Sequence, residues 1–425
     1  MYNQLLVIKK FFPIISLTFV NVIGFSLLIP VFPHIVRLYV PEQYISIVYG
    51  LLLSSYSLFQ FVGAPILGAL SDKHGRKPLL ILSQLGTTLS WVLFGFAYLT
   101  PNIPIFGLGL PIFVIILSRI VDGVTGGNVS VANAWVSDVT TPEERTKAFG
   151  LIGATFGIGF LIGPAIGGLS ASAGAGYIGT VIVAFVISLL TLLQIGFMLP
   201  ESLPIEKRVK SETISYWAEI NILNKFKIFR NNLAVKKLLI VRLFIGIIFS
   251  AYTTIIILFI EKSFTLDALG IGLTLSFVGM FSIFNQAFLT PKFATKIGDK
   301  KTLYIGLAII SIGLSLIPLI PTTLYYGKII NIGFILFLFN AFFMNLGISL
   351  SLPTFKALLT KSVDETKQGI ITGIDESLLA LGNSFTPVIA GFLYSFAGVL
   401  TFLFFSTFLL IPFIFFKIRY KSAHL

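Results

Sequence analysis

The sequence predicts an all-α integral membrane protein, with twelve membrane-spanning helices arranged as two bundles of six. Three observations favour this fold class. Hydrophobic residues make up 56% of the 425 residues and charged residues only 11%, whereas about a quarter of a soluble domain is charged. The apolar residues form runs of about 20, the length that a helix needs to cross a bilayer. These runs lack the alternation of polar and apolar residues that a membrane β-barrel requires.

The predicted helices fall into two sets on either side of one long polar loop. We expect domains at 1–200 and 237–425, joined by a cytoplasmic linker at 201–236. The predicted spans are 11–33, 44–70, 79–99, 110–136, 147–171 and 176–199, then 237–260, 268–290, 302–320, 329–355, 368–396 and 398–416.

An internal repeat supports this division. Adding 223 to a residue number takes Gly75 to Gly298 and Gly150 to Gly373. The same offset aligns residues 163–168 with residues 386–391, where a proline and a glycine recur at matching places. Several matches at one offset indicate duplicated halves in the same orientation, with a substrate path between them.

The basic residues indicate how the chain is oriented. Of the 30 Lys and Arg residues, Arg37, Lys262 and Lys328 fall on one side of the predicted topology, and Arg119 and Arg242 fall within spans. All the others fall on the side that holds both termini, which the positive-inside rule assigns to the cytoplasm. We therefore expect a multi-pass protein of the cell (plasma or inner) membrane. Basic residues spread over many loops also argue against nucleic-acid binding.

The composition excludes several kinds of chemistry. The chain has no cysteine, and its three histidines lie far apart, so we predict no disulfide and no metal site. It has no phosphate-binding Gly-x-x-x-x-Gly-Lys-[Ser/Thr] loop and no visible pair of nucleophile and base, so we expect neither a cofactor nor an enzyme. Active transport would draw its energy from a gradient. We expect a monomer embedded in the lipid bilayer.

The loop after the second predicted span carries the motif Gly-Ala-Leu-Ser-Asp-Lys-His-Gly-Arg-Lys at 68–77. Gly68 would permit close helix contact, and Gly75 would permit a tight turn. The motif resembles the signature loop of the major facilitator superfamily of transporters. The plainer alternative is that Lys77 and its basic neighbours only anchor this loop at the cytoplasmic surface. That alternative does not explain the glycines or the aspartate.

The resemblance implies a gating cluster. Arg76 would link Asp72 to an acidic residue at the end of the fourth span, where Asp138 stands. Asp72 would also pack against the start of the eleventh span at 367–369, where a helix N-terminus presents positive charge. The cluster would then latch the halves in the outward-open state. In the second half Thr295 replaces the aspartate, so a latch there would be weaker.

The fourth predicted span contains two charged residues, Arg119 and Asp122. Each costs roughly 2.5 to 3.5 kcal/mol at the centre of a membrane helix, so each needs a pairing or functional reason. They lie three residues apart and share a helix face. They resemble the fourth-span motif of the superfamily, whose arginine is implicated in proton transfer. The alternative is an ion pair with a structural role only.

The fifth predicted span contains Gly159, Gly163, Pro164, Gly167 and Gly168. Small residues four apart let helix backbones approach closely, and proline bends a helix. The set resembles the antiporter motif of drug:proton exporters. The alternative is ordinary helix packing without any bearing on transport direction. The segments 138–150 and 199–203 also resemble the tetracycline-efflux branch of these exporters.

The first span departs from that branch at Asn21, where exporters of tetracycline-like cations commonly carry Asp. An amide can bind substrate but cannot exchange a proton near neutral pH. A coupling carboxylate would therefore lie elsewhere, and the candidates are Asp122, Asp375 and Glu376. Because adjacent helical residues point about 100° apart, we expect only one of the last two to face the central cavity.

Alternatives remain for the charges of the second half. Asp375 and Glu376 could instead lie among the lipid headgroups and pair with Lys361 or Lys367. We expect Arg242 to extend its side chain to the membrane surface rather than to bind substrate.

Polar residues within the spans suggest substrate contacts. We take Asn21, Gln60 and Asn345 as cavity candidates, since amides can hydrogen-bond a substrate. Many such residues instead join helices.

The resulting prediction is a secondary active transporter that exports a small amphipathic or drug-like molecule in exchange for protons, by alternating access. One alternative is an uptake symporter or facilitator for a small metabolite. An alternative of another class is a transport-inactive membrane receptor or scaffold on the same fold.

Overall fold

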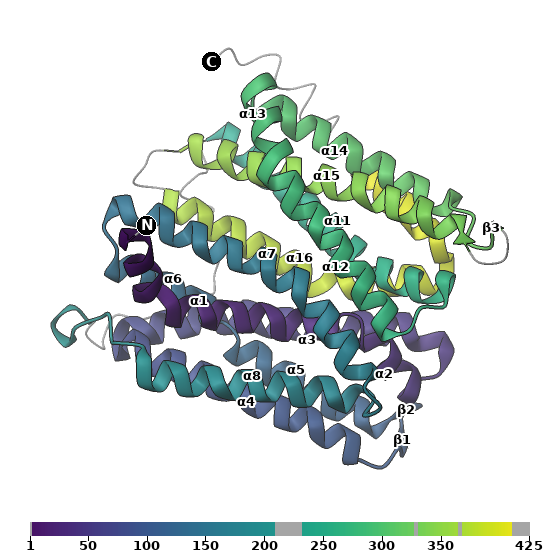
Figure 1. The fold of residues 1–425 in the computed structure, drawn as a ribbon, viewed down its shortest axis with the longest axis horizontal. Helices are drawn as coiled ribbons and strands as arrows, with labels where there is room; N and C mark the ends of the chain where they lie inside the picture. The colour runs from purple at the N-terminus through teal and green to yellow at the C-terminus, as the bar shows by residue number, and fades with distance from the viewer. Residues whose placement is uncertain (1, 209–231, 327–329, 364–367, 410–425) are drawn as a thin grey trace. The chain divides into compact units, whose positions relative to one another are not determined.

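A computed structural model describes residues 2–208, 232–326, 330–363 and 368–409 of the chain, and these residues are almost entirely helical (Figure 1). The helices of the first part are α1 (Tyr2–Leu28), α2 (Phe32–Tyr39), η1 (Glu42–Tyr44), α3 (Ile45–His74), α4 (Arg76–Leu99), α5 (Leu110–Thr125), α6 (Asn128–Val139), α7 (Pro142–Ser172), α8 (Tyr177–Met198) and η2 (Ile205–Lys207). Those of the second part are α11 (Leu233–Phe264), α12 (Ala268–Phe284), η3 (Asn285–Leu289), α13 (Thr290–Ile297), α14 (Asp299–Leu316), η4 (Ile317–Leu319), α15 (Ile332–Lys361), α16 (Gln368–Ala397), η6 (Gly398–Leu400) and a helix at 401–409.

The helical membrane fold is confirmed. Among the described residues, nine helical segments are long and apolar enough to span a bilayer, and the bent pair formed by α1 and α2 makes up to ten. One of the nine, Ile371–Leu409, covers both of the last two predicted spans. The predicted fifth span falls on α7, of which Gly157–Ser172 is counted as a shorter apolar helix. Every predicted span therefore falls mainly on helix. Residues 329 and 410–416 of two spans lie outside the described residues, and Ile330–Asn331 form a strand.

The predicted fourth span is confirmed as one span, Leu110–Val139, but its helix is interrupted. α5 ends at Thr125 and α6 begins at Asn128, with Gly126 and Gly127 between them. Glycine is a poor helix former, and a Cβ on Gly127 would lie 2.4 Å from the Cα of Ala64 on α3. Close packing on α3 therefore requires glycine where the helix breaks.

Two further irregularities sit at prolines. The axes of α1 and α2 differ by 46°, and Pro30 lies in the break between them. η3 is a single π-helical turn just before Pro291. Proline cannot donate a backbone hydrogen bond and its ring crowds the preceding turn, which accounts for both departures.

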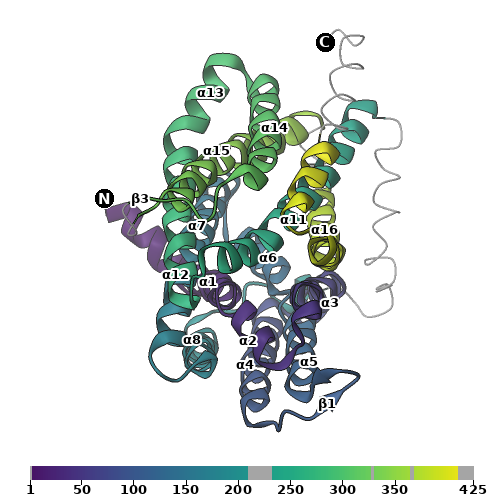
Figure 2. The ribbon, with the colours of Figure 1, turned by 90° about the vertical axis from the view of Figure 1, so that its right-hand side faces the viewer.

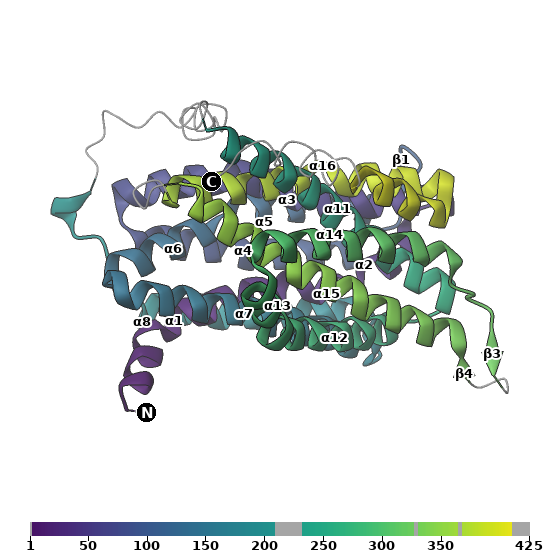
Figure 3. The same cartoon turned by 90° about the horizontal axis from the view of Figure 1, so that it is seen from above.

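The chain divides into two compact units that cut across the helix order. Unit 1 comprises Met1–Ile45, Leu52–Asn221 and Asp267–Ser276, and unit 2 comprises Ser46–Leu51, Ile222–Leu266 and Phe277–Leu425. In unit 1, α1 packs against α7 and α8, and α4 packs against α5 and α8 (Figure 1). In unit 2, α14 packs along α15 (Figure 3), and α11 along α16 (Figure 2). Most of the predicted linker, residues 209–231, lies outside the described residues.

Glycine contacts explain why two short segments join the other unit. Within unit 1, a Cβ on Gly272 of α12 would lie 2.3 Å from the carbonyl oxygen of Pro164 on α7. Within unit 2, a Cβ on Gly391 of α16 would lie 2.1 Å from the carbonyl oxygen of Ser46 on α3. Both helix pairs therefore touch backbone to backbone, as small residues allow.

The four short strands of the described residues form two hairpins. β1 (Pro104–Ile105) pairs with β2 (Leu108–Gly109), and β3 (Tyr325–Tyr326) pairs with β4 (Ile330–Asn331), both antiparallel. The first hairpin turns through Phe106 and Gly107, which both have positive φ. It lies between α4 and α5, beyond the end of α4 that is remote from Arg76 (Figure 1).

Candidate functional site

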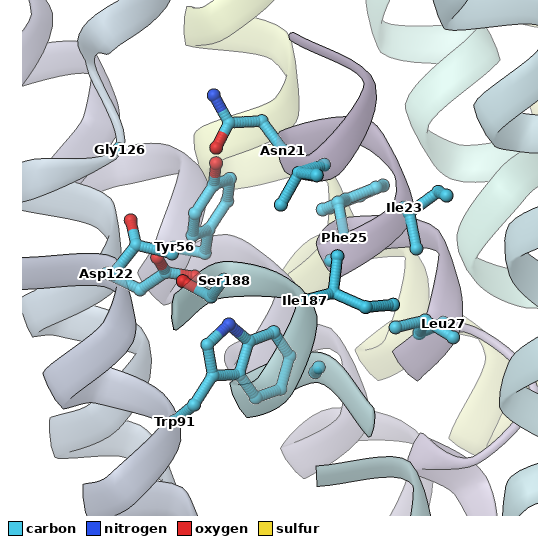
Figure 4. A pocket seen from close by; sticks show the side chains of 14 residues that line it. Asn21, Ile23, Phe25, Leu27, Tyr56, Trp91, Asp122, Gly126, Ile187 and Ser188 are labelled. Atoms are coloured by element: carbon cyan, nitrogen blue, oxygen red, sulfur yellow. The ribbon is translucent and has the colours of Figure 1, made fainter. Parts of the chain in front are cut away.

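A pocket lies inside unit 1, enclosed by α1, α3, α4, α5 and α8. The space inside it, counted together with the solvent into which it opens, is about 420 Å³. Polar side chains gather on one side of it and aliphatic side chains, with Phe25, on the other (Figure 4). The polar members are Asn21, Tyr56, Thr87, Asp122 and Ser188, joined by the indole of Trp91. The pocket can thus contact a molecule that has both a polar and an apolar part.

The two charged residues of α5 form a buried ion pair at this pocket. Nη1 of Arg119 lies 3.1 Å from Oδ2 of Asp122, and the side chains are 3% and 9% exposed. The guanidinium stacks on aromatic rings of α4, 5.0 Å from the centroid of Trp91 and 5.3 Å from that of Phe94. Cation–π contact and the nearby carboxylate both stabilise a buried arginine. Nε of Arg119 has no hydrogen-bond partner among the described residues.

Asn21 lies in the same pocket, as Figure 4 shows. Its Nδ2 donates to Oδ1 of Asn128 at 2.8 Å, at the first residue of α6. The amide therefore joins α1 to the helix that follows the break. It still faces the pocket that Asp122 lines.

The other two predicted cavity residues make helix contacts. Nε2 of Gln60 donates to the hydroxyl of Tyr56 and to the carbonyl of Gly126, both at 3.1 Å. Gln60 thereby ties the end of α5 to α3 and orients Tyr56, which lines the pocket. Asn345 lies in unit 2, where its Nδ2 donates to the carbonyl of Val278 at 3.4 Å.

The glycine motif of α7 holds α1 in place. A Cβ on Gly159 would lie 2.7 Å from Val22, one on Gly163 would lie 1.9 Å from Oγ of Ser26, and one on Gly167 would lie 2.1 Å from the carbonyl oxygen of Leu27. The motif also includes Pro164, which lies inside α7, and Gly168, which packs on α12. Because α1 carries Asn21, this packing positions one wall of the pocket.

A cluster of charges surrounds Arg76 at the junction of α3 and α4. Nη1 of Arg76 lies 2.5 Å from Oδ1 of Asp72, and Nε lies 3.1 Å from Oδ2 of Asp138. Nη1 also donates to Oγ of Ser71 at 2.6 Å. The structure thus brings together the three residues that the resemblance links. The expected partner of Asp72 on the eleventh span falls partly in 364–367, outside the described residues.

The two glycines of this loop behave differently. Gly75 has φ of +101°, a conformation that favours glycine, and its Cβ would lie 2.3 Å from Oε2 of Glu201. Gly68 lies where α3 contacts α6, but this contact does not require glycine. A Cβ there would lie 3.6 Å from Oγ of Ser130, an ordinary van der Waals distance.

Glu201 is a residue of this cluster that sequence reasoning missed. Its Oε1 accepts from the backbone N–H of Arg76 at 2.9 Å, and its Oε2 accepts from that of Lys77 at 3.3 Å. A carboxylate at these free N–H groups caps α4 and complements its dipole. Ser202 donates to Oδ2 of Asp138 at 2.9 Å. The segment 199–203 had drawn attention only through its resemblance to exporters.

The second half also contains a buried ion pair, and this corrects the expectation for Arg242. Nε of Arg242 on α11 lies 2.5 Å from Oδ1 of Asp375 on α16, with side chains 7% and 5% exposed. Arg242 therefore does not extend to the membrane surface. Glu376 is exposed and lies 3.4 Å from Nζ of Lys356.

Of the alternative partners proposed for these acids, Lys361 is not the one found, and Lys367 is not tested. Lys361 pairs with Asp299 at 2.7 Å instead, and Lys367 lies outside the described residues. Thr295, at the position equivalent to Asp72, hydrogen-bonds only to carbonyls of its own helix, Pro291 and Lys292, among the described contacts.

Besides Glu201, sequence reasoning missed Tyr56 and Trp91. No motif contains them, and aromatic residues in membrane helices are too common to stand out. The spacing of Trp91 and Phe94 could have indicated their role, because residues one helical turn apart share a face and can contact the same arginine.

Comparison with known proteins agrees with this architecture. Residues 14–344 match the Major Facilitator Superfamily. The chain is 31% identical to the class H tetracycline resistance protein of Pasteurella multocida over 92% of this chain and 90% of that protein. It is 28% identical to multidrug resistance protein 2 of Bacillus subtilis (strain 168), over 90% and 88% of the two chains.

Among solved structures, the chain resembles a D-xylose-proton symporter with a TM-score of 0.74. The match covers 98% of this chain and 97% of that one at 16% identity, which establishes the fold alone. The chain is therefore a multi-pass membrane protein that belongs to the Major Facilitator Superfamily of transporters.

Proposed function

We propose that this chain is a proton-coupled exporter, which removes a small amphipathic or drug-like molecule from the cell in exchange for protons. The near full-length similarity to tetracycline and multidrug resistance proteins supports export. The two-sided pocket of unit 1 supports an amphipathic substrate. Alternating access moves the substrate site from one face of the membrane to the other.

The observation that carries the proposal is the position of Asp122. Antiport requires a group that is shared between proton and substrate, so that binding one favours loss of the other. Asp122 lines the pocket, and its only ion-pair partner among the described residues is Arg119. Asp122 can supply the carboxylate that position 21 lacks, because Asn21 and Asp122 line the same pocket.

The coupling step follows from this geometry. When Asp122 accepts a proton, its attraction to Arg119 is lost. The guanidinium then keeps its aromatic contacts with Trp91 and Phe94 and its hydrogen bond to Oγ of Ser118. When substrate enters from the cytoplasm and contacts the carboxylate, the proton leaves and the ion pair forms again. Arg119 thus acts as the counter-ion that makes proton loss favourable.

We assign gating to the cluster around Arg76. Its guanidinium joins the end of α3, through Asp72, to the end of α6, through Asp138. Glu201 adds the segment after α8 by capping α4. A cluster that ties three helix ends together can hold one conformation and release it when an ion pair breaks.

The test uses inside-out membrane vesicles that respiration acidifies, with a pH-sensitive dye to report the gradient. A panel of cationic, zwitterionic and anionic compounds is added in turn. We expect a subset to dissipate the gradient with the native protein and not with Asp122→Asn. The matched control is Glu376→Gln, which removes an exposed acid and should behave as native.

Two outcomes would overturn the proposal. If Asp122→Asn, extracted as a monodisperse protein, still dissipates the gradient, Asp122 is not the coupling residue. If no compound acts while labelled metabolites cross proteoliposomes without a gradient, the chain is a facilitator.

A further inference from the structure

The second half holds a buried ion pair that no motif includes. Arg242 and Asp375 join α11 to α16 inside unit 2, with Nε and Oδ1 2.5 Å apart. The guanidinium lies over the ring of Phe355 on α15, 5.8 Å from its centroid. An arginine stacked on an aromatic ring beside one aspartate is also the arrangement of Arg119 and Asp122 in unit 1.

The neighbouring ion pair of Glu376 and Lys356 is an ordinary surface contact and serves for comparison. Glu376 and Lys356 are 3.4 Å apart, and their side chains are 59% and 52% exposed. Such a pair contributes little, since water screens it. The buried pair differs because neither charge can be left without its partner in that position.

Resting on the proposed function, we propose that Arg242 and Asp375 form a second proton-exchange site, so that each transport cycle moves one proton more than Asp122 alone can carry. Asp375 is the group that takes up the proton, and Arg242 is a positioning residue that acts through it. Among the described side chains, the other charged groups near enough to act on Asp375 are Glu376 on its own helix and Lys356 on α15.

The pair couples a proton to a movement of helices. When the carboxylate of Asp375 is ionised, it neutralises Arg242 at the observed distance. A proton arriving from outside converts it to the neutral acid, and no bond other than O–H is made. Arg242 is then a buried cation without a counter-ion, which is unfavourable until water reaches it. The protonated state therefore favours local separation of α11 from α16, and proton release to the cytoplasm restores the pair.

A purely structural role would make a different prediction. The two helices already pack along much of their length, so they do not need a charge to stay together. Replacing a buried ion pair with apolar residues of similar volume is often neutral for stability. The variant Arg242→Met/Asp375→Leu should thus fold in either case, while only the proton-exchange role requires the charges.

The experiment measures stoichiometry in proteoliposomes that contain the full chain, with the membrane potential held at zero. Substrate accumulation is followed at a series of pH gradients, using a compound identified in the vesicle panel. The slope of log accumulation against the pH difference gives the protons exchanged per substrate. We expect about 2 for the native protein and about 1 for Arg242→Met/Asp375→Leu, since coupling free energy scales with proton number.

The matched control is Lys356→Gln/Glu376→Gln, which should keep the native slope. If the apolar double variant does not fold, Arg242→Gln/Asp375→Asn makes the same test. A native slope in a neutral double variant overturns the inference and leaves the proposed function intact. A native protein whose substrate accumulation ignores the pH gradient overturns the proposed function itself.

Discussion

Three arginines among the described residues are buried, and each contacts a carboxylate. Arg76 meets Asp72 and Asp138, Arg119 meets Asp122, and Arg242 meets Asp375. The guanidinium has five donors in a plane and keeps its charge when buried, whereas a lysine in such a place loses its proton readily. Arginine therefore suits positions where a positive charge must persist while a neighbouring acid gains or loses a proton.

At the same scale, the paired glycines Gly75 and Gly298 allow a controlled prediction. Both have positive φ, +101° and +81°, and Gly298 has no neighbour within 4 Å of an added Cβ. We expect Gly298→Ala to cost about 1–3 kcal/mol from backbone strain alone. Gly75→Ala should cost more, because its Cβ would also displace Glu201. Thermal unfolding of the two detergent-purified variants measures the difference.

Equal melting temperatures for those variants would show that Glu201 does not hold the start of α4. A third variant, Glu201→Gln, separates the two contributions. It keeps the side-chain volume and removes the charge, so it should lose the helix-dipole part, about 0.3–1 kcal/mol.

The charged residues of the site could be identified from the sequence, but not all their partners. A charge within an apolar run is visible at once, and Arg119 and Asp122 are close enough along one helix to pair. Glu201 reaches Arg76 across 125 positions, and Arg242 reaches Asp375 across 133. Such contacts depend on which helices are neighbours, which one sequence does not reveal.

At the scale of elements, the contact of α7 with α1 is highly sensitive to side-chain size. Helix backbones approach so closely there that the side chain of even an alanine would not fit. The same helix offers an internal control at Gly157, where a Cβ would meet nothing within 4 Å.

We expect Gly167→Ala to force α1 away from α7, at a cost of about 1–3 kcal/mol. Transport should fall as well, since α1 carries Asn21 into the pocket. Gly157→Ala should instead gain up to about 1 kcal/mol from its better helix propensity. Melting temperature and vesicle transport, measured side by side, check both expectations, and a loss of similar size in both variants would contradict them.

Elements also show a correspondence that was not expected. Under the offset of 223, Arg76 corresponds to Asp299 and Asp138 to Lys361. Both pairs are ion pairs, at 3.1 Å and 2.7 Å, with the charges exchanged. The second half therefore has a tie between α14 and α15, although its loop lacks the aspartate of the motif.

Helix positions were largely predictable because a bilayer demands long apolar runs. Helix breaks were not. The interruption at Gly126 and Gly127 depends on packing against α3, and the π turn lies just before Pro291. Neither could be predicted, because glycine or proline within a span does not always break the helix.

For the molecule as a whole, the compact units and the predicted domains divide the chain differently. The predicted boundaries follow chain order, while the units exchange the starts of α3 and α12. This exchange arises from glycine contacts at Gly272 and Gly391, which hydropathy does not register. We keep the chain-order domains as a proposal about evolutionary origin by duplication.

The orientation of the whole molecule is open to a direct test, because the chain has no cysteine. Phe106 at the tip of the first hairpin is 96% exposed, and Lys207 is exposed in η2. We expect a membrane-impermeant maleimide to label Phe106→Cys in intact cells and Lys207→Cys only in inside-out vesicles. The reverse pattern would place both termini outside. α4, of 24 residues, separates the two sites by roughly 36 Å.

The stacking of Arg119 on Trp91 also gives the pocket its own optical reporter. Trp91 is one of three tryptophans, and its indole is 2% exposed beneath a guanidinium. Trp135 is equally buried but donates to the carbonyl of Pro200, near the charge cluster, and Trp217 lies outside the described residues. Indole emission depends on the charge and water beside the ring. Intrinsic fluorescence can therefore follow occupation of the pocket in the unlabelled protein, with Trp91→Phe defining the share of the signal that belongs to it.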